Sequence, residues 1–258
     1  MPPHPTLREL AGDAWHELTG YDGRIMATLR GLARPGFLTR EYIEGRRAHY
    51  LPPVRVYLVV SVIYFVIAAS APTLGSGREG EITGPGGMRI GVTRSNGEPE
   101  ISDADRAELQ AEVDRAPWIM QPMLRAFADD PGAFRARMFS VMPRVFFAML
   151  PVFAAIVALL YRRRPFPTAL VLAVHLHAFA FIAFTLSELV KFTGREHLAD
   201  RVSAIMAVVF AVYALKSFRA VFGGRWPVTM LKAAGIGFVY LVAAVPAFMV
   251  IMLWASWM

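Results

Sequence analysis

The sequence predicts an all-α protein: a polytopic helical membrane bundle of five transmembrane helices, with the amino terminus in the cytoplasm and the carboxyl terminus outside. Hydrophobic residues make up 55% of the chain and its mean hydropathy is +0.42, which is unusual for a soluble protein. A helix that crosses a bilayer needs about 20 mostly apolar residues. The chain contains five runs of about that length: Val54–Pro72, Phe139–Tyr161, Pro167–Val190, Val202–Phe218 and Met230–Trp257.

Residues 1–53 are expected to form a cytoplasmic amphipathic leader. Apolar residues recur near helical spacing at Leu7, Leu10, Ala14 and Leu18, and again at Ile25, Leu29 and Leu32. Pro35 and Gly36 interrupt this pattern, and Pro52 with Pro53 ends it. Two interpretations of the basic residues here remain open. They form an interfacial platform that contacts anionic lipids at the cytoplasmic face, or they are ordinary juxtamembrane charges that only set the topology.

Residues 54–258 are expected to form the membrane domain, with an external connection over residues 73–138. The chain does not begin with a basic segment followed at once by an apolar one, so the first span is predicted to be an uncleaved anchor. The Gly-rich first half of the connection predicts a loop with a small hairpin. In its second half, Ser102 is a predicted helix N-cap with Asp105 as its partner, and "PWIMQPMLRAFADD" predicts another helix. Pro131 is expected to restart a helix that runs into the second span.

Lys and Arg residues favour one side of the predicted spans, and this asymmetry predicts the orientation. The cytoplasmic side carries Arg8, Arg24, Arg30, Arg34, Arg40, Arg46, Arg47 and Arg55, then Arg162–Arg164, then Lys216, Arg219 and Arg225. The other side offers Lys191, Arg195 and Arg201. We therefore expect a multi-pass protein of the bacterial cytoplasmic (inner) membrane. These residues also account for the formal charge of +7, so no nucleic-acid partner is predicted.

The sequence lacks the common signatures of catalysis and cofactor binding. Cysteine is absent, which excludes disulfides and thiolate metal sites. There is no P-loop, no Gly-x-Ser-x-Gly, no His-Glu-x-x-His and no pair of carboxylates within the spans. No catalytic residue, metal ligand or cofactor is therefore predicted, and an enzyme is not the favoured class.

Three stretches resemble an uncharacterised bacterial membrane family, domain of unknown function 3667. They are "TLRGLARPGFLTREYIEGRRAHYLPPVRVYL", "PRVFFAMLPVFAAIVALLYRRRPFPTALVLAVHLHAF" and "YALKSFRAVFGGRW". Two departures stand out: the amino-terminal Cys-x-x-Cys zinc ribbon of many members is absent, and Thr168 and Ala169 replace an acidic–His pair. His175 falls on the family's later histidine. The resemblance implies fold and membrane location, and it implies no activity.

The segment "LVLAVHLHAFAF" places His175 and His177 near the middle of the third span. Residues two apart on a helix are separated by about 200°, so these histidines face nearly opposite sides and cannot bind one metal together. The other histidines lie outside the core, so a metal or haem would need ligands from another chain. Open interpretations are a proton relay or substrate contact, a shared haem, or, favoured here, structural hydrogen bonds to neighbouring helices. At most one histidine is expected to face a functional interior.

Glu188 and Arg144 are predicted to form an ion pair near the external surface. Glu188 follows His177 by eleven residues, which returns it to within about 20° of the same helix face, roughly 16 Å further along. Arg144 lies at a similar depth on the preceding span, and charges inside a membrane usually pair. The alternative is that Glu188 reaches interfacial water beside Lys191.

These observations favour an integral membrane protein that acts as a non-enzymatic accessory or scaffold subunit, as a homo-oligomer or with a protein partner. The alternative is a small transporter or proton-coupled carrier that uses the polar residues of the third span. The first hypothesis predicts histidines packed tightly by Phe and Leu without a cavity. The second predicts a polar cavity that joins His177, Glu188 and Arg144.

Overall fold

The computed structural model of the chain describes residues 23–70, 81–83, 89–95, 98–101, 111, 113–118 and 120–257. Residues 23–32 are helical. The elements that follow are α2 (Phe37–Ile43), the 3-10 turn η1 (Arg47–His49), α3 (Pro53–Ser70), β1 (Glu81–Thr83), β2 (Arg89–Ser95), β3 (Glu98–Ile101), α5 (Gln121–Asp129), α6 (Pro131–Leu160), α7 (Phe166–Lys191), α8 (Glu196–Phe222) and α9 (Trp226–Trp257). The helix expected at Leu7–Leu18 and the N-cap expected at Ser102 lie outside the described residues.

Five helices, α3 and α6 to α9, are long and apolar enough to cross a membrane, which confirms the predicted polytopic bundle. Several are longer than the apolar runs. The helix expected from Val202 begins at Glu196, and the one expected from Phe139 begins at Pro131. The reason is that hydropathy marks only residues inside the hydrocarbon, about 30 Å thick, whereas a 30-residue helix is about 45 Å long.

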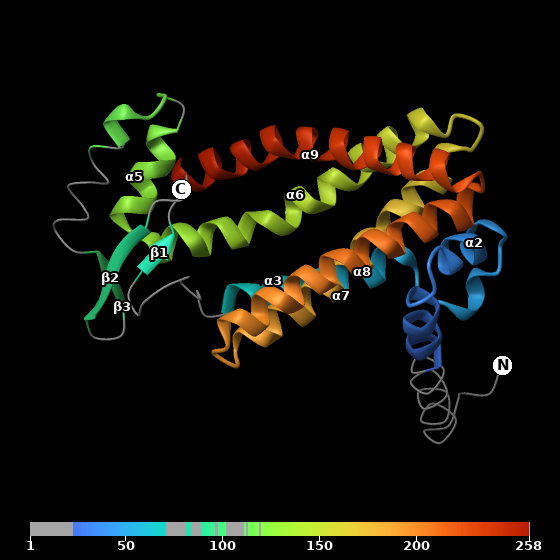
Figure 1. Cartoon of the computed structure of the whole chain (residues 1–258), viewed down its shortest axis with the longest axis horizontal. Coiled ribbons are helices and arrows are strands. Elements are labelled where there is room, and N and C mark those ends of the chain that lie inside the picture. Colours follow the sequence, from blue (N-terminus) through green and yellow to red (C-terminus); the bar gives the residue numbers. More distant parts are fainter. Residues whose placement is uncertain are drawn as a thin grey trace, which may run out of the picture.

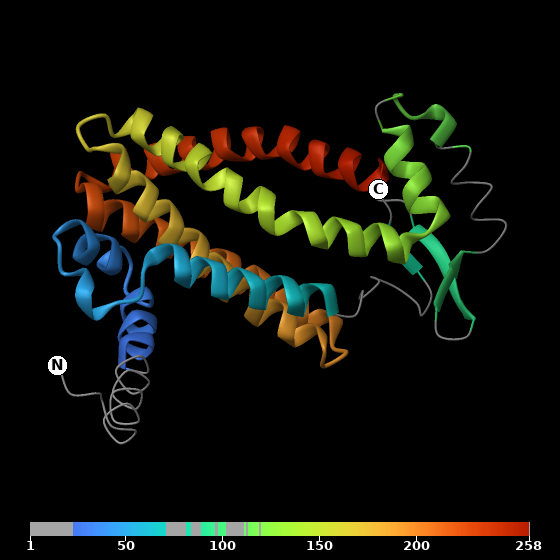
Figure 2. The same ribbon diagram turned by 180° about the vertical axis from the view of Figure 1, so that it is seen from behind.

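The central helix of the bundle is α7, which contacts α2, α3, α6 and α8. Leu172 and Ala173 of α7 are fully buried, as are Ala154 and Val157 of α6. Small residues such as Ala173 and Ala154 allow helix backbones to approach closely in a membrane. In both views α6 and α9 lie side by side, and α3, α7 and α8 form a second group (Figures 1 and 2).

The connection between α3 and α6 contains a three-stranded antiparallel sheet in the order β1–β2–β3. Ile82 is opposite Ile90, and Val92 is opposite Ile101. This sheet has one strand more than the predicted hairpin. The predicted helix in its second half is present as α5, and Asp130 caps α6 by accepting a hydrogen bond from the Ala133 N–H at 2.8 Å. The predicted restart of a helix at Pro131 is confirmed.

The two ends of the bundle carry different elements. One end carries α2, the α6–α7 loop and the α8–α9 loop, and we call it the leader end (Figure 1). The other end carries the sheet and α5, and we call it the sheet end (Figure 2). The leader here means residues 23–52.

Candidate functional site

His175 is buried, with 5% of its surface exposed, and its partner comes from the leader. Its Nδ1 lies 2.9 Å from the hydroxyl of Thr39, a residue of α2 that is itself 1% exposed. A buried polar group without a partner costs free energy, so each residue satisfies the other. The contact joins the short leader helix to the central helix of the bundle.

His177 lies two residues further along α7 and has partners on both ring nitrogens. Its Nδ1 is 2.8 Å from the Ala173 carbonyl oxygen, and its Nε2 is 2.8 Å from the Tyr240 hydroxyl on α9. A carbonyl oxygen can only accept, so Nδ1 carries a proton and donates to Ala173. In the neutral ring Nε2 then accepts from the Tyr240 O–H. The ring of Phe153 also packs nearly perpendicular to that of His177, with ring centroids 5.3 Å apart.

The two histidines therefore face different neighbours, as their spacing predicted. His175 faces α2 and His177 faces α9. The favoured interpretation, structural hydrogen bonds to other elements, agrees with this geometry. The partner residues Thr39 and Tyr240 were not singled out from the sequence. The hydroxyl of Tyr240 in the middle of an apolar run is a usable signal, because a buried tyrosine hydroxyl usually has a partner.

The leader packs against the bundle at further points. The hydroxyl of Tyr213 on α8 donates to the carbonyl oxygen of Leu32 at 2.8 Å. Leu32 and Leu38 share an apolar cluster with Val56 at the start of α3 and Ala178 of α7. The leader and the first turn of α3 thus cover the same part of the central helix.

Gly36 lies where the leader turns against α8. Its φ of +72° is in the left-handed region, which favours glycine. A Cβ at this position would lie 2.8 Å from the Cβ of Ala220 and 3.1 Å from the Ser217 carbonyl oxygen. The break predicted at Pro35 and Gly36 is thus a close contact between the leader and α8 as well as a turn.

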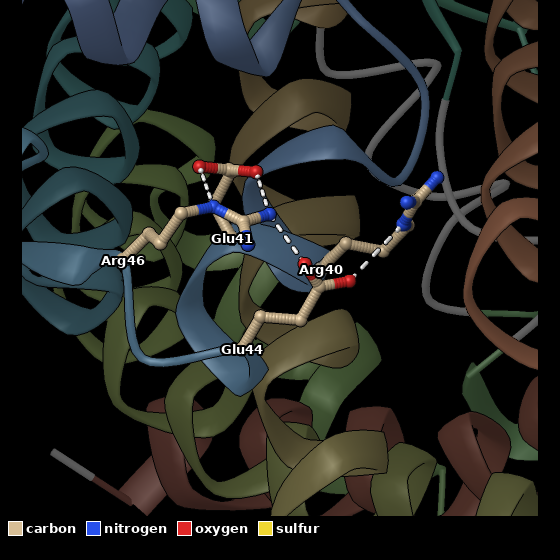
Figure 3. A network of polar contacts seen from close by, with 4 residues as sticks. All are labelled: Arg40, Glu41, Glu44 and Arg46. Atoms are coloured by element: carbon tan, nitrogen blue, oxygen red, sulfur yellow. Dashed lines mark hydrogen bonds and ion pairs between the residues drawn. The ribbon is translucent and has the colours of Figure 1, made fainter.

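A polar network closes the exposed end of α2 (Figure 3). Arg46 donates to both carboxylate oxygens of Glu41, through Nε at 2.9 Å and through Nη2, and it also pairs with Glu44. Arg40 lies 3.7 Å from Glu44. The hydrogen bond from Arg46 holds the pKa of the Glu41 carboxyl below its ordinary value, and Glu41 and Glu44 raise the pKa of Arg46. The network orients the chain between α2 and η1.

The predicted ion pair between Arg144 and Glu188 is wrong. Glu188 pairs with Lys191, three residues on in the same helix, at 2.8 Å. Arg144 is exposed and has no ion pair within the part of the chain that the structure describes. Lys191 lies about one turn from Glu188 on the same helix, so the two side chains can meet whatever the rotation of α6. A pair with Arg144 would require α6 to turn that residue toward α7. Glu188 beside Lys191 corresponds to the alternative that the sequence left open.

A cavity of about 670 Å³ lies beside His177, where α6, α7, α8 and α9 meet. Its lining is almost entirely apolar, and only Tyr64, His177 and Tyr240 bring polar side chains to it. Neither Glu188 nor Arg144 lines it. The cavity therefore differs from both expectations: His177 is not sealed in by Phe and Leu, and this cavity does not join His177 to Glu188 and Arg144. Across the described ranges, no group of three or more His, Cys, Asp or Glu side chains is arranged to hold a metal ion.

Comparison with known proteins locates the family resemblance. A model of the family described as "Protein of unknown function (DUF3667)" matches residues 22–65. The matched segment contains Gly36, Thr39, the network around Arg46 and the first part of α3. The part of the chain that is similar to this family is therefore the leader together with residues 53–65 of α3. No curated protein and no solved structure matches the chain.

Proposed function

We propose that this integral membrane protein is a non-enzymatic accessory or scaffold subunit of the bacterial cytoplasmic membrane. The observation that carries the proposal is the use of the polar side chains inside the bundle. Thr39 with His175, and His177 with Tyr240, each join two separate elements. Groups committed to such pairs hold separate elements of the fold together.

The docked leader supports the same function. Tyr213, His175 and Gly36 fasten it to α7 and α8 at separate points. A buried polar pair is costly to break on one side, so the leader and these two helices form one stable body. Such a body presents its exposed apolar faces to the bilayer or to a second membrane protein, as a scaffold subunit requires.

The exposed charges of the leader support an inward orientation. Arg24, Arg30, Arg40 and Arg47 are exposed at the same end as Arg162–Arg164. By the positive-inside rule this end faces the cytoplasm. Cations at that surface attract anionic lipids, so a lipid-facing leader is part of the proposal.

A small carrier is the second candidate, and one observation favours it. The His177–Tyr240 pair lines the 670 Å³ cavity, so a titratable ring borders an internal space. A proton-coupled carrier would also need polar groups that lead from this pair to both surfaces. The apolar lining of the cavity weighs against that path.

The test uses the protein extracted gently from its native membrane at its natural level. We expect a featureless visible spectrum and either a stoichiometric protein partner or a defined homo-oligomer. In liposomes with a pH gradient we expect no proton flux. A haem band or bound metal that is lost in His175→Ala would overturn the proposal. So would a flux that is lost in Tyr240→Phe and kept in Tyr64→Phe, a matched control that removes another hydroxyl from the same cavity.

A further inference from the structure

A basic pocket of about 770 Å³ lies at the leader end, between the α6–α7 loop and the start of α9. Arg162, Arg163, Arg164 and Lys232 line it, and no acidic residue does. None of these four cations forms an ion pair within the described part of the chain. Four unneutralised cations around one hollow make a site for an anion.

Two of these cations are held in place by the end of α6. Lys232 donates to the carbonyl oxygen of Leu160 at 3.0 Å and lies 4.4 Å from the centroid of the Tyr161 ring. Arg162 donates through Nε to the carbonyl oxygen of Leu159 at 3.1 Å. Tyr161 also lines the pocket, and its hydroxyl is buried without a hydrogen-bond partner in the described residues. The site is thus partly organised before any anion binds.

The walls of this pocket continue into those of the apolar cavity. On α8, Phe222 lines the pocket, and Phe218, one turn earlier, lines the cavity. On α9, Lys232 lines the pocket and the next residue, Ala233, lines the cavity. At about 1.5 Å per residue, the cavity wall from Ala233 to Tyr240 extends about 10 Å further along α9. A charged head site therefore lies next to the apolar cavity, and α8 and α9 contribute walls to both.

We propose that the seam between α8 and α9 binds one anionic phospholipid. Its phosphate lies among Arg162, Arg163, Arg164 and Lys232, and one acyl chain extends past Ala233 and Gly237. Arginine and lysine side chains recognise phosphate through charge-assisted hydrogen bonds, and basic pockets between transmembrane helices bind anionic head groups. The apolar cavity favours a lipid over a free phosphate ion, because only the lipid also covers that surface. The proposal does not depend on the accessory role.

The head-group contacts are tested on the purified full-length protein by native mass spectrometry. The probes are phosphatidylglycerol and phosphatidylcholine with identical acyl chains. We expect phosphatidylglycerol to be retained in preference, and the preference to fall by about a hundredfold in R162Q/R163Q/R164Q, which loses three charge contacts. The matched control R144Q/R195Q/R201Q removes three exposed arginine charges that lie outside both the pocket and the leader, and it should keep the preference. Equal loss in both triple variants would overturn the site and indicate general surface attraction.

The acyl-chain contact is tested by filling the cavity. A Cβ at Gly237 or at Gly235 would meet nothing within 4 Å, but only Gly237 lines the cavity. We expect Gly237→Leu to lower phosphatidylglycerol retention several-fold and Gly235→Leu to leave it unchanged. If Gly237→Leu has no effect while inorganic phosphate displaces the lipid, the site binds a free anion and the lipid proposal is overturned. The melting temperature of each variant is measured as well, so that a loss of lipid retention caused by misfolding is recognised.

Discussion

The hydroxyl of Thr39 lies 2.9 Å from Nδ1 of His175, although 136 residues separate them in the chain. Thr39 belongs to the short leader helix and His175 to the central helix of the bundle. The contact explains the imidazole in an otherwise apolar span: His175 forms a hydrogen bond with the leader, a segment that does not itself span the membrane. The question of how much this contact stabilises the fold can be answered by substitution.

Replacing Thr39 by Val should destabilise the protein by about 1–3 kcal/mol, because Nδ1 of His175 then has no partner in a buried site. The measurement is thermal unfolding in detergent, together with the rate of proteolysis within the leader. Thr185→Val is the matched control. Its hydroxyl donates only to the Phe181 carbonyl oxygen in its own helix, so the loss there should be smaller. Equal losses would mean that the leader contact has no special weight.

Replacing Tyr240 by Phe should leave Nε2 of His177 without its donor. We expect a loss of about 1–3 kcal/mol in the free energy of unfolding. In the parent protein, nitrogen NMR of labelled histidine should show His177 with its proton on Nδ1, since the Ala173 carbonyl oxygen can only accept. A His177 signal with the proton on Nε2 would contradict the assigned hydrogen bonds.

Gly36→Ala should be more destabilising than Gly45→Ala. Both glycines have positive φ, +72° and +83°, so both substitutions carry a backbone cost of about 1–2 kcal/mol. At Gly45 a Cβ meets nothing within 4 Å, whereas at Gly36 it lies 2.8 Å from the Cβ of Ala220. The difference in melting temperature therefore isolates the contact between the leader and α8. Identical melting temperatures would show that α8 shifts away from the added Cβ with no loss of stability.

A double-mutant cycle should find coupling between Glu188 and Lys191 and none between Glu188 and Arg144. The first pair is 2.8 Å apart, with 16% and 33% of the side chains exposed for Glu188 and Lys191. Its coupling should be no more than about 1 kcal/mol, as for other partly exposed pairs. The variants are Glu188→Gln, Lys191→Gln and Arg144→Gln, and the measurement is thermal unfolding. Coupling to Arg144 alone would restore the pair predicted from the sequence.

The network at the end of α2 should give the leader a weak dependence on acid. The pKa of Glu41 is lower in the folded chain than its ordinary value of 4.5. Its contribution to stability is therefore present above pH 4.5 and is lost as the pH falls through the folded pKa. The hydrogen-exchange protection factors of residues 41–47, which correct for the intrinsic pH dependence of exchange, should fall across this range in the parent protein. In Glu41→Gln the protection factors should be low both above and below the folded pKa of Glu41. If that variant shows the same fall in protection on acidification as the parent protein, the assignment is contradicted.

The sequence predicts which residues form each span better than it predicts how each helix is rotated about its own axis. The five spans follow from apolar runs, because hydrocarbon tolerates few other compositions. The different directions of His175 and His177 follow from helical geometry alone. Arg144 and Glu188 were placed correctly on their helices, but pairing also depends on how α6 turns about its own axis. That rotation is set by packing over the whole helix, which no local pattern records.

The docking of the leader was the largest omission. Its apolar spacing predicted an amphipathic helix, and that pattern is the same whether the apolar face meets lipid or protein. Thr39 and Tyr213 form the hydrogen bonds that place this face against protein and not against lipid. Each contributes a single hydroxyl group, which leaves no repeating pattern in the sequence. Gly36 was interpreted as a turn, and its contact with Ala220 depends on residues far along the chain. Long-range contacts of single side chains are what the sequence leaves undetermined.

The unequal fastening of the helices has a mechanical consequence. The leader clasps α7 and α8 through Thr39, Leu32 and Gly36, so these two helices cannot slide past each other unless the leader detaches. By contrast, α9 is tied to α7 through Tyr240 and to the end of α6 through Lys232. The leader thus clamps α7 and α8 to each other, whereas α9 is held by its packing against α6 and by these two side-chain contacts.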